Sequence, residues 1–180
     1  MSWESTAEYY RAINEGVKQA LGGLHSAKIV LYSVDFEPIE NLQHKGDWDG
    51  TATILVDAAR CVEAGGADFL LICTNTTHRV AEEIEAAVSM PLLHIADATA
   101  EILQKRGIKT VGLLGTAFTM EQEFYRGRLQ DRYGMDVLVP DSAQRQQVHE
   151  IIYRELCLGK VRASSKAAYL EIIDTLAERG

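Results

Sequence analysis

The stretch DFLLICTNTTHRVAEEI, residues 68–84, joins an apolar run to a helical pattern through a short polar cluster. Residues 68–73 are apolar on both faces, as a central strand of a parallel sheet must be. The polar cluster, residues 74–78, follows at once, and residues 78–89 predict a helix. Ligands bind at such strand-to-helix junctions in open α/β sheets, so this is the most chemically suggestive point in the chain.

Composition limits the classes of protein to which the chain can belong. Its 180 residues, 47% of them hydrophobic, suit one large domain or two small lobes. The net charge of -8 and the absence of a basic run exclude a nucleic-acid partner. No apolar run is long enough to cross a membrane and the first residues do not resemble a signal peptide, so we expect a cytoplasmic protein. The three cysteines lack metal-ligand or disulfide spacing, which predicts free thiols and no metal site.

The remaining sequence alternates between helical and strand patterns. A Ser-x-x-Glu capping box at residues 5–8 opens the first predicted helix. The predicted strands are residues 27–34, 68–73, 91–95, 109–115 and 135–140. The other predicted helices are residues 51–66, 78–89, 97–106, 120–134, 142–159 and 164–180, with a loop or short helix at 35–50. This alternation predicts a parallel, doubly wound α/β fold.

An internal repeat predicts two lobes with the same plan. The stretch from Thr116 aligns with the stretch from Met1 at a shift of 115 positions, and the match includes Glu, Tyr and Arg at equivalent places. We therefore expect two pseudo-symmetric parallel-sheet lobes, residues 1–96 and 97–180. Comparing them predicts that the first lobe lacks its first strand and the second its last, so that the chain is truncated at both ends.

Five motifs along the chain carry a family resemblance: MSWESTAEYY, CTNTTH, LHIADAT, LLGTAFTMEQEFYRGRL and IIYRELCLGK. Together they resemble the aspartate/glutamate racemase family, and in particular its broad-specificity amino-acid racemases. The resemblance covers essentially the whole chain. It implies an isomerase that needs no pyridoxal phosphate, metal or other cofactor and whose partner is a small-molecule amino acid.

The resemblance also implies a mechanism. In the family, two cysteine thiols face opposite sides of the substrate α-carbon; one removes the proton and the other returns it. Aligning the Asn-Thr pair places Thr74 at the first cysteine position, while the Gly-Cys-Thr-Glu motif of the second cysteine is absent. We therefore expect that the 180-residue chain by itself does not racemise an amino acid. A threonine hydroxyl is a far weaker acid than a thiol, so Thr74 would relay or donate a proton. Strand alternation should turn Cys73 to the other face, where it would act as a small apolar residue.

The resemblance implies that the amino acid is bound by Met1, Gln43, Thr74, Asn75, Thr76, Thr116 and Thr119. Thr74 is also the catalytic candidate. Met1 and Thr116 are expected in equivalent loops that line a cleft between the lobes. Gln43 reads equally as a polar surface residue, and Thr119 as a helix cap. We expect His78 to be exposed to solvent at the start of a helix.

Two other functions stay open. A fragment or degenerate paralogue could bind an amino acid without turning it over. The pattern Cys73-x5-Arg79 also matches a tyrosine-phosphatase loop, although its threonines disfavour the tight phosphate cradle that glycines provide. A homodimer is compatible with either racemase or binding protein.

Overall fold

The computed structural model describes residues 2–180 and is helix-rich, with a small parallel sheet. The α/β class predicted from the alternation is confirmed. The chain divides into two compact units, Met1–Leu93 and His94–Gly180. Met1, expected in the substrate site, lies outside the described residues. The lobe boundary expected after Ala96 stays a prediction, because contacts alone do not establish that two lobes are related.

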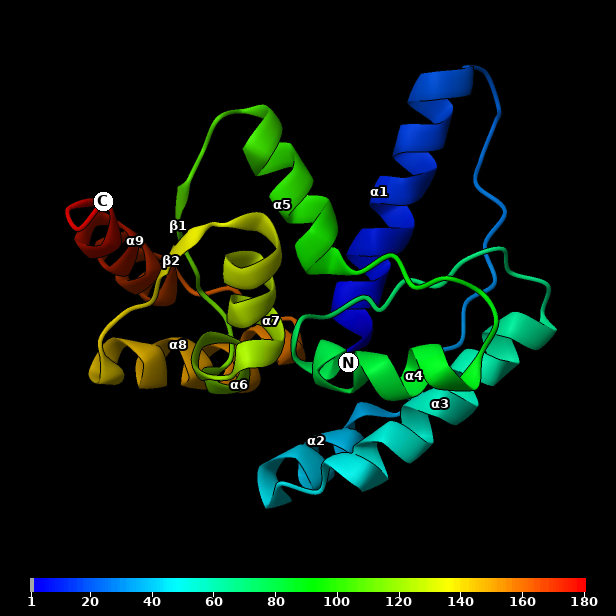
Figure 1. Cartoon of the computed structure of the whole chain (residues 1–180), viewed down its shortest axis with the longest axis horizontal. Helices are drawn as coiled ribbons and strands as arrows, with labels where there is room; N and C mark the ends of the chain where they lie inside the picture. The colour runs from blue at the N-terminus through cyan, green and yellow to red at the C-terminus, as the bar shows by residue number, and fades with distance from the viewer. Residues whose placement is uncertain (1) are drawn as a thin grey trace. The chain divides into compact units, whose positions relative to one another are not determined.

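Unit 1 contains four α-helices and one 3-10 helix, shown from blue to green in Figure 1. They are α1 (Trp3–Leu21), α2 (Phe36–Lys45), α3 (Trp48–Ala64), the 3-10 helix η1 (Thr76–Val80) and α4 (Ala81–Ala87). Aspartates start two of them: the side chain of Asp35 accepts from the N–H of Glu37, and that of Asp47 from the N–H of Gly50. The core of this unit lies where α2, α3 and α4 pack around Ile39, Leu55 and Ile84.

The start of α1 differs from the predicted capping box. The helix begins at Trp3, and its N-cap residue Ser2 makes no side-chain cap. Ser5 instead donates its hydroxyl to the carbonyl oxygen of Cys73 at 2.6 Å, while Glu8 pairs with Arg11 at 2.7 Å. The capping-box prediction was wrong because the Ser5 hydroxyl bonds to a residue that is far away in the sequence. This bond connects α1 to Cys73, the residue directly before the polar cluster.

The predicted strands of unit 1 are present only as extended chain with little pairing. Leu70 and Leu92 form an isolated parallel bridge, in which the N–H of Leu70 donates to Pro91 and that of Leu93 donates to Leu70, both at 2.9 Å. Residues 27–34 are not assigned as strand. The strand prediction was therefore wrong for 27–34, because a strand requires a neighbour at hydrogen-bonding distance and none of the described residues provides one.

Unit 2 carries the sheet and the remaining helices (Figure 1). Its elements are α5 (Ile95–Lys105), β1 (Thr110–Gly112), α6 (Ala117–Glu121), α7 (Glu123–Gly127), the π-helix η2 (Arg128–Arg132), β2 (Asp136–Leu138), α8 (Ser142–Arg154), the 3-10 helix η3 (Leu156–Leu158) and α9 (Ala163–Ala177). β1 and β2 are parallel, with Val111 opposite Val137. Both are shorter than the predicted strands.

The prediction of a single helix over residues 120–134 was wrong. Gln122 has extended backbone angles, φ −100° and ψ 152°, which end α6 and begin α7. A π-helical turn then follows from Arg128. Sequence periodicity did not reveal this break, because Gln122 is an ordinary helix former.

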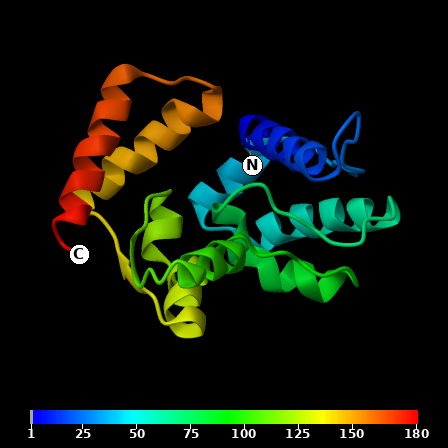
Figure 2. The same ribbon diagram turned by 90° about the horizontal axis from the view of Figure 1, so that it is seen from above.

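Packing of α8 and α9 completes unit 2. The two helices lie side by side in the orange and red part of Figure 2, and they contact each other. Asp141 starts α8 with a full capping box to Gln144. Gly112 of β1 lets α9 approach closely, since a Cβ there would lie 3.2 Å from the Cδ1 of Leu176. Over residues 2–180, no helix is long and apolar enough to cross a bilayer.

Candidate functional site

The polar cluster of residues 74–78 forms a tight turn that leads into η1. The N–H of Thr74 donates to the carbonyl of Ile72 at 2.8 Å, and the N–H of His78 donates to the carbonyl of Asn75 at 3.0 Å. Thr74 and Asn75 are half-buried, while Thr76 is buried. The turn thus holds three short polar side chains at the end of the apolar run, as the sequence predicted for this junction.

His78 is buried, not solvated. Its side chain is 2% exposed, and its Nδ1 lies 2.7 Å from the carbonyl oxygen of Thr74. A carbonyl only accepts hydrogen bonds, so Nδ1 must carry the proton in this contact. The expectation of a solvated histidine was wrong because this imidazole folds back on the turn, and it fixes the backbone of Thr74.

Two buried polar side chains in unit 1 lack a hydrogen-bond partner within the described chain. Gln43 is 2% exposed and both polar atoms of its amide are unpaired, and the hydroxyl of Thr77, 1% exposed, is unpaired as well. Burying an unpaired polar group costs about 1–3 kcal/mol, so such groups require an explanation. A bound polar ligand would be one such explanation. The alternative prediction, that Gln43 is a polar surface residue, was wrong because the side chain is buried.

Gln43 is connected to the junction indirectly, through the packing of helices. It lies near the end of α2, α2 packs along α3 (Figure 1), and α3 contacts η1, which contains Thr76 and Thr77. Thr77 was missed by the sequence reasoning. Its position directly after three selected residues, 74–76, could have indicated it. Nothing in the sequence, however, distinguishes a buried threonine from an exposed one.

The thiol of Cys73 is not activated as a nucleophile or base. Burial raises the pKa of its thiol, so the thiol stays protonated near neutral pH. Its carbonyl accepts the Ser5 hydroxyl, and its side chain is half-buried. This agrees with the reading of Cys73 as a small apolar residue.

The phosphatase reading fails on the same residues. A phosphatase nucleophile must be a thiolate, which needs a lowered pKa, and that of Cys73 is raised. The Arg that should clamp the phosphate oxygens, Arg79, lies over the ring of Trp48 at 4.5 Å from its centroid. The structure therefore disfavours a C-x5-R phosphatase.

Unit 2 has its own pair of buried threonines. Thr116 is the N-cap of α6: its Oγ1 accepts from the N–H of Thr119 at 3.3 Å and lies 3.2 Å from the Oγ1 of Thr119. The next N–H, of Ala117, donates to Nδ1 of His149 at 3.1 Å. Sequence reasoning missed His149, which comes from α8 and carries no local motif. The cap of α6 is therefore Thr116, and Thr119 supplies the N–H that the cap accepts.

Of the expected site, the structure brings together the three consecutive residues Thr74, Asn75 and Thr76. Thr74, Asn75, Thr76 and Gln43 belong to unit 1, whereas Thr116 and Thr119 belong to unit 2. Within residues 2–180, no three His, Cys, Asp or Glu side chains are grouped closely enough to hold a metal ion. What the junction offers is a set of neutral hydrogen-bonding groups, suited to a small polar ligand.

Comparison with known proteins adds to this geometry. The family described as Asp/Glu/Hydantoin racemase matches residues 1–180. Among curated proteins, the chain is similar to the broad specificity amino-acid racemase RacX of Bacillus subtilis (strain 168), with 34% identity over 106 residues. That match covers 59% of this chain and 45% of the relative, so it spans less than half of the relative's length.

Solved structures give longer matches. A protein from Yersinia pestis assigned as an Asp/Glu racemase is 55% identical, with a TM-score of 0.89, over 99% of this chain and 78% of its own. An aspartate racemase homologue from Pyrococcus horikoshii OT3 is 33% identical, with a TM-score of 0.73, over 87% of this chain and 68% of its own. The aspartate racemase of Picrophilus torridus is 20% identical with a TM-score of 0.74, over 97% of this chain and 72% of its own, and shows a shared fold.

Proposed function

The chain belongs to the Asp/Glu/hydantoin racemase family, and from this premise we propose that its unit 1 junction binds an amino acid and exchanges the α-proton. The proposal takes the broad-specificity racemases as the nearest functional class, because RacX carries that description. It includes two related lobes, residues 1–96 and 97–180, each with threonines at a strand-to-helix turn. It requires no pyridoxal phosphate or metal.

One observation carries the proposal: buried polar groups without partners lie in the same unit as the family motif. The amide of Gln43 and the hydroxyl of Thr77 are both buried and unpaired. An amino acid carries an ammonium that donates and a carboxylate that accepts hydrogen bonds. An amide has both donors and an acceptor, so either group of the ligand would relieve the cost of burying Gln43.

The chemistry assigned to the junction is proton transfer at the α-carbon. The α-hydrogen is a very weak acid, and removing it places negative charge on the carboxylate of the substrate. Hydroxyl and amide donors of Thr74, Asn75 and Thr76 would stabilise that charge. The His78 contact holds Thr74 in place. The Thr74 oxygen would accept the α-proton as its own hydroxyl proton passes to a solvent base, and the reverse transfer would return a solvent proton to the α-carbon.

Racemisation needs an acid-base group on each face of the α-carbon, because one group acting alone restores the original configuration. Thr74 is proposed for one face. The resemblance implies a cysteine for the other, and Cys73 does not suit that role, since its thiol is kept neutral. The proposal therefore separates two activities, binding with exchange at Thr74 and full inversion.

The test measures these activities separately. The protein is incubated with L-glutamate, L-aspartate or L-lysine in deuterium oxide, and binding, α-deuterium incorporation and chirality are followed. We expect binding, with exchange reduced at least about 100-fold in Thr74→Ala. The matched control is Thr53→Ala, since Thr53 is exposed and its hydroxyl only donates to the carbonyl of Asp49.

The outcomes distinguish the candidate functions. Binding without exchange would favour the non-catalytic paralogue, and no binding of any amino acid would contradict both. Activity abolished by a chelator and restored by a metal would contradict the cofactor-free part of the proposal.

A further inference from the structure

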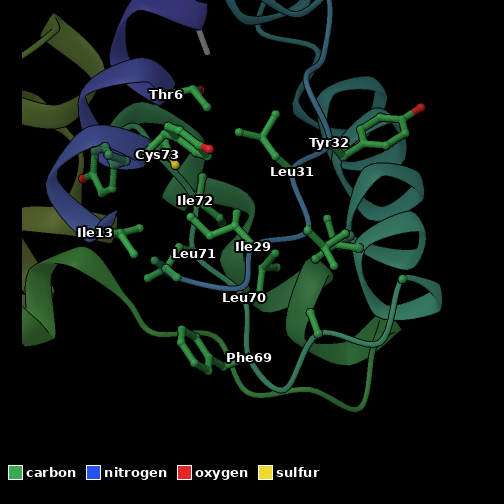
Figure 3. Close-up of a pocket in the computed structure, with 18 of the residues that line it drawn as sticks. Thr6, Ile13, Ile29, Leu31, Tyr32, Phe69, Leu70, Leu71, Ile72 and Cys73 are labelled. Atoms are coloured by element: carbon green, nitrogen blue, oxygen red, sulfur yellow. The ribbon is translucent and has the colours of Figure 1, made fainter. Parts of the chain in front are cut away.

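The polar turn of each unit is anchored to a distant helix. In unit 1, the Ser5 hydroxyl of α1 donates to the Cys73 carbonyl, and Thr6 of the same helix lines a cavity together with Cys73 (Figure 3). In unit 2, the N–H of Ala117 donates to Nδ1 of His149, which comes from α8. The second contact carries a condition that the first does not, because an imidazole nitrogen accepts a hydrogen bond only when it bears no proton.

The turn in unit 2, residues 115–119, leads from β1 into α6. Thr116 lies past the carboxyl end of β1, which is where ligands bind in open α/β sheets. The turn is tight: a Cβ on Gly115 would lie 3.0 Å from the Cβ of Thr119, so Thr119 packs directly against the backbone. Since Thr116 and Thr119 are buried and contact each other, the position of both side chains follows that of the turn.

α6 is fastened to α8 at both of its ends (Figure 1). At its start Ala117 donates to His149, and at its end Glu121 accepts from Nε of Arg145 at 2.8 Å. His149 and Arg145 are four residues apart and therefore lie on one face of α8. The Glu121 side chain is 50% exposed, and ion pairs at such positions contribute little. The contact that directs the start of α6 is therefore that of His149.

Neighbouring aromatic rings fix the orientation of the His149 imidazole. The Phe118 ring meets it edge-on, with 6.0 Å between the ring centroids and 69° between the planes, and the Tyr153 centroid lies 4.8 Å away. Such edge-on and tilted contacts between rings are favourable, so they hold the imidazole against rotation. Val148, the preceding residue, is 0% exposed in the core of unit 2, which gives the imidazole a fixed base on α8. With Nδ1 as acceptor, the neutral ring carries its proton on Nε2.

From this geometry we propose that His149 is a positioning residue. Its neutral imidazole, with the proton on Nε2, holds the turn of Thr116 and Thr119 in the orientation that binds the amino acid. The inference rests on the proposed function and on the expected part of both threonines in binding. His149 acts through the Ala117 N–H rather than by contact with the ligand. Loss of the contact should therefore weaken binding and leave proton transfer at Thr74, once the ligand is bound, little changed.

The test removes the hydrogen bond from each side. His149→Phe keeps an aromatic ring without an acceptor, and Ala117→Pro removes the donor. Proline suits this position, since Ala117 is the first residue of α6 and Thr116 before it has extended angles, φ −63° and ψ 160°.

Two further variants serve as rescue and control. His149→Asn is the rescue variant, because the Oδ1 of asparagine stands at the same number of bonds from the backbone as Nδ1 of histidine and accepts a hydrogen bond. Glu121→Gln is the control, since it breaks the ion pair to Arg145 at the other end of α6 and leaves the His149 contact in place.

Binding of L-glutamate, L-aspartate and L-lysine is measured by calorimetry, and α-deuterium incorporation at saturating ligand is followed separately. We expect His149→Phe and Ala117→Pro each to raise Kd about tenfold, with the exchange rate at saturation within about twofold of that of the unchanged chain. The double variant should bind no more weakly than either single variant, because both changes remove the same bond. His149→Asn and Glu121→Gln should bind like the unchanged chain.

A measurement without ligand follows the hydrogen bond itself. In NMR spectra of the isotope-labelled chain, we expect a scalar coupling across the hydrogen bond between the amide nitrogen of Ala117 and Nδ1 of His149. The ring nitrogens should show the proton on Nε2. Circular dichroism confirms that each variant is folded; if His149→Phe unfolds, Ala117→Pro and the coupling in the unchanged chain decide.

Failure of this inference and failure of the proposed function give different results. If the unchanged chain binds an amino acid but His149→Phe and Ala117→Pro bind equally well, or His149→Asn binds as weakly as they do, the inference is wrong and the proposed function stands. Absence of the coupling, or a proton on Nδ1, overturns the inference whether or not a ligand binds. If the coupling is present and no amino acid binds, the proposed function fails, and His149 only caps α6.

Discussion

Both units bury threonines where an apolar run meets a helix, but among the described residues the threonine hydroxyl that is buried without a partner, that of Thr77, lies in unit 1. Thr116 and Thr119 contact each other, and the Thr116 hydroxyl accepts the N–H of Thr119. In unit 1 the hydroxyl of Thr77 and the amide of Gln43 are buried without a partner. Helix capping therefore explains the first pair, whereas the second set has no such explanation and is the basis on which we propose a ligand.

The backbone hydrogen bonding of the two units differs in the same way. β1 and β2 of unit 2 pair over three residues each, while the extended residues 27–34 of unit 1 have no ladder. Among the described residues, unit 1 thus holds most of the buried side-chain atoms that lack a partner, including those of Gln43 and Thr77, whereas unit 2 has the Nε of Arg126. We expect this contrast to affect stability, reactivity and pH dependence.

The largest effect is expected for Gln43→Leu. Replacing a buried, unpaired amide by an apolar side chain of similar size should stabilise the protein by about 2 kcal/mol. The same change should weaken amino-acid binding at least tenfold, if the amide contacts the ligand. Urea unfolding and calorimetric titration measure the two effects.

The control for that variant is Gln146→Leu. Gln146 is exposed on α8, where its amide donates to Glu150, so the free energy of unfolding should change by less than about 0.5 kcal/mol. A loss of stability in Gln43→Leu would show that the amide is satisfied in solution and would remove the contrast between the units.

A matched pair of threonine variants should give changes of opposite sign. Thr119→Val removes one partner of the Thr116 contact and should destabilise by about 1.5 kcal/mol. Thr77→Val replaces an unpaired hydroxyl by a methyl and should stabilise by about 1 kcal/mol. Thermal unfolding compares them directly, and equal signs would contradict the assignment of one threonine to capping and the other to a ligand.

Cysteine reactivity should also follow the structure. Burial raises the pKa of Cys73, so its thiolate fraction near pH 8 is small, whereas Cys61 is exposed. In single-cysteine variants we expect a thiol reagent to modify Cys73 at least about tenfold more slowly, a difference of about 1.4 kcal/mol. The Cys73 rate should keep rising above pH 9, because a raised pKa moves ionisation to higher pH; a plateau below pH 8 would contradict it.

The sequence predicted the positions of most elements but not their pairing. Hydrophobic periodicity predicted α3 and α9. In the structure, the polar turn and the helical segment η1 follow residues 68–73, as the sequence predicted. Pairing depends on which backbone lies at strand spacing, and residues 27–34 show that β-branched composition alone does not supply it. The break at Gln122 was equally invisible, since it depends on packing.

The candidate site shows the same limit. Thr74, Asn75 and Thr76 were found from the motif, and they lie together at the turn. The burial of Gln43 and His78 could not be predicted, because polar residues are mostly exposed and single sequences do not reveal the exceptions. Each exception is decided by tertiary contacts, such as that between His78 and the Thr74 carbonyl.

The last prediction compares one ion pair from each unit. In unit 2, Arg128 donates two hydrogen bonds to Asp97, at 2.6 and 2.7 Å, and the two side chains are 17% and 26% exposed. The pKa of Asp97 is lowered chiefly by the Arg128 hydrogen bond, so the pair stabilises the folded state above the unfolded pKa near 4 and loses this effect as the pH falls through the lower folded pKa. Asp97→Asn should therefore destabilise by about 1 kcal/mol at pH 7 and by nothing near pH 2. In unit 1 the Glu8–Arg11 pair is exposed, so Glu8→Gln should change stability by less than about 0.5 kcal/mol at either pH. Urea unfolding across pH 2–7 measures both variants, and a pH-independent loss in Asp97→Asn would mean that packing of α5, not the charge on Asp97, stabilises this part of unit 2.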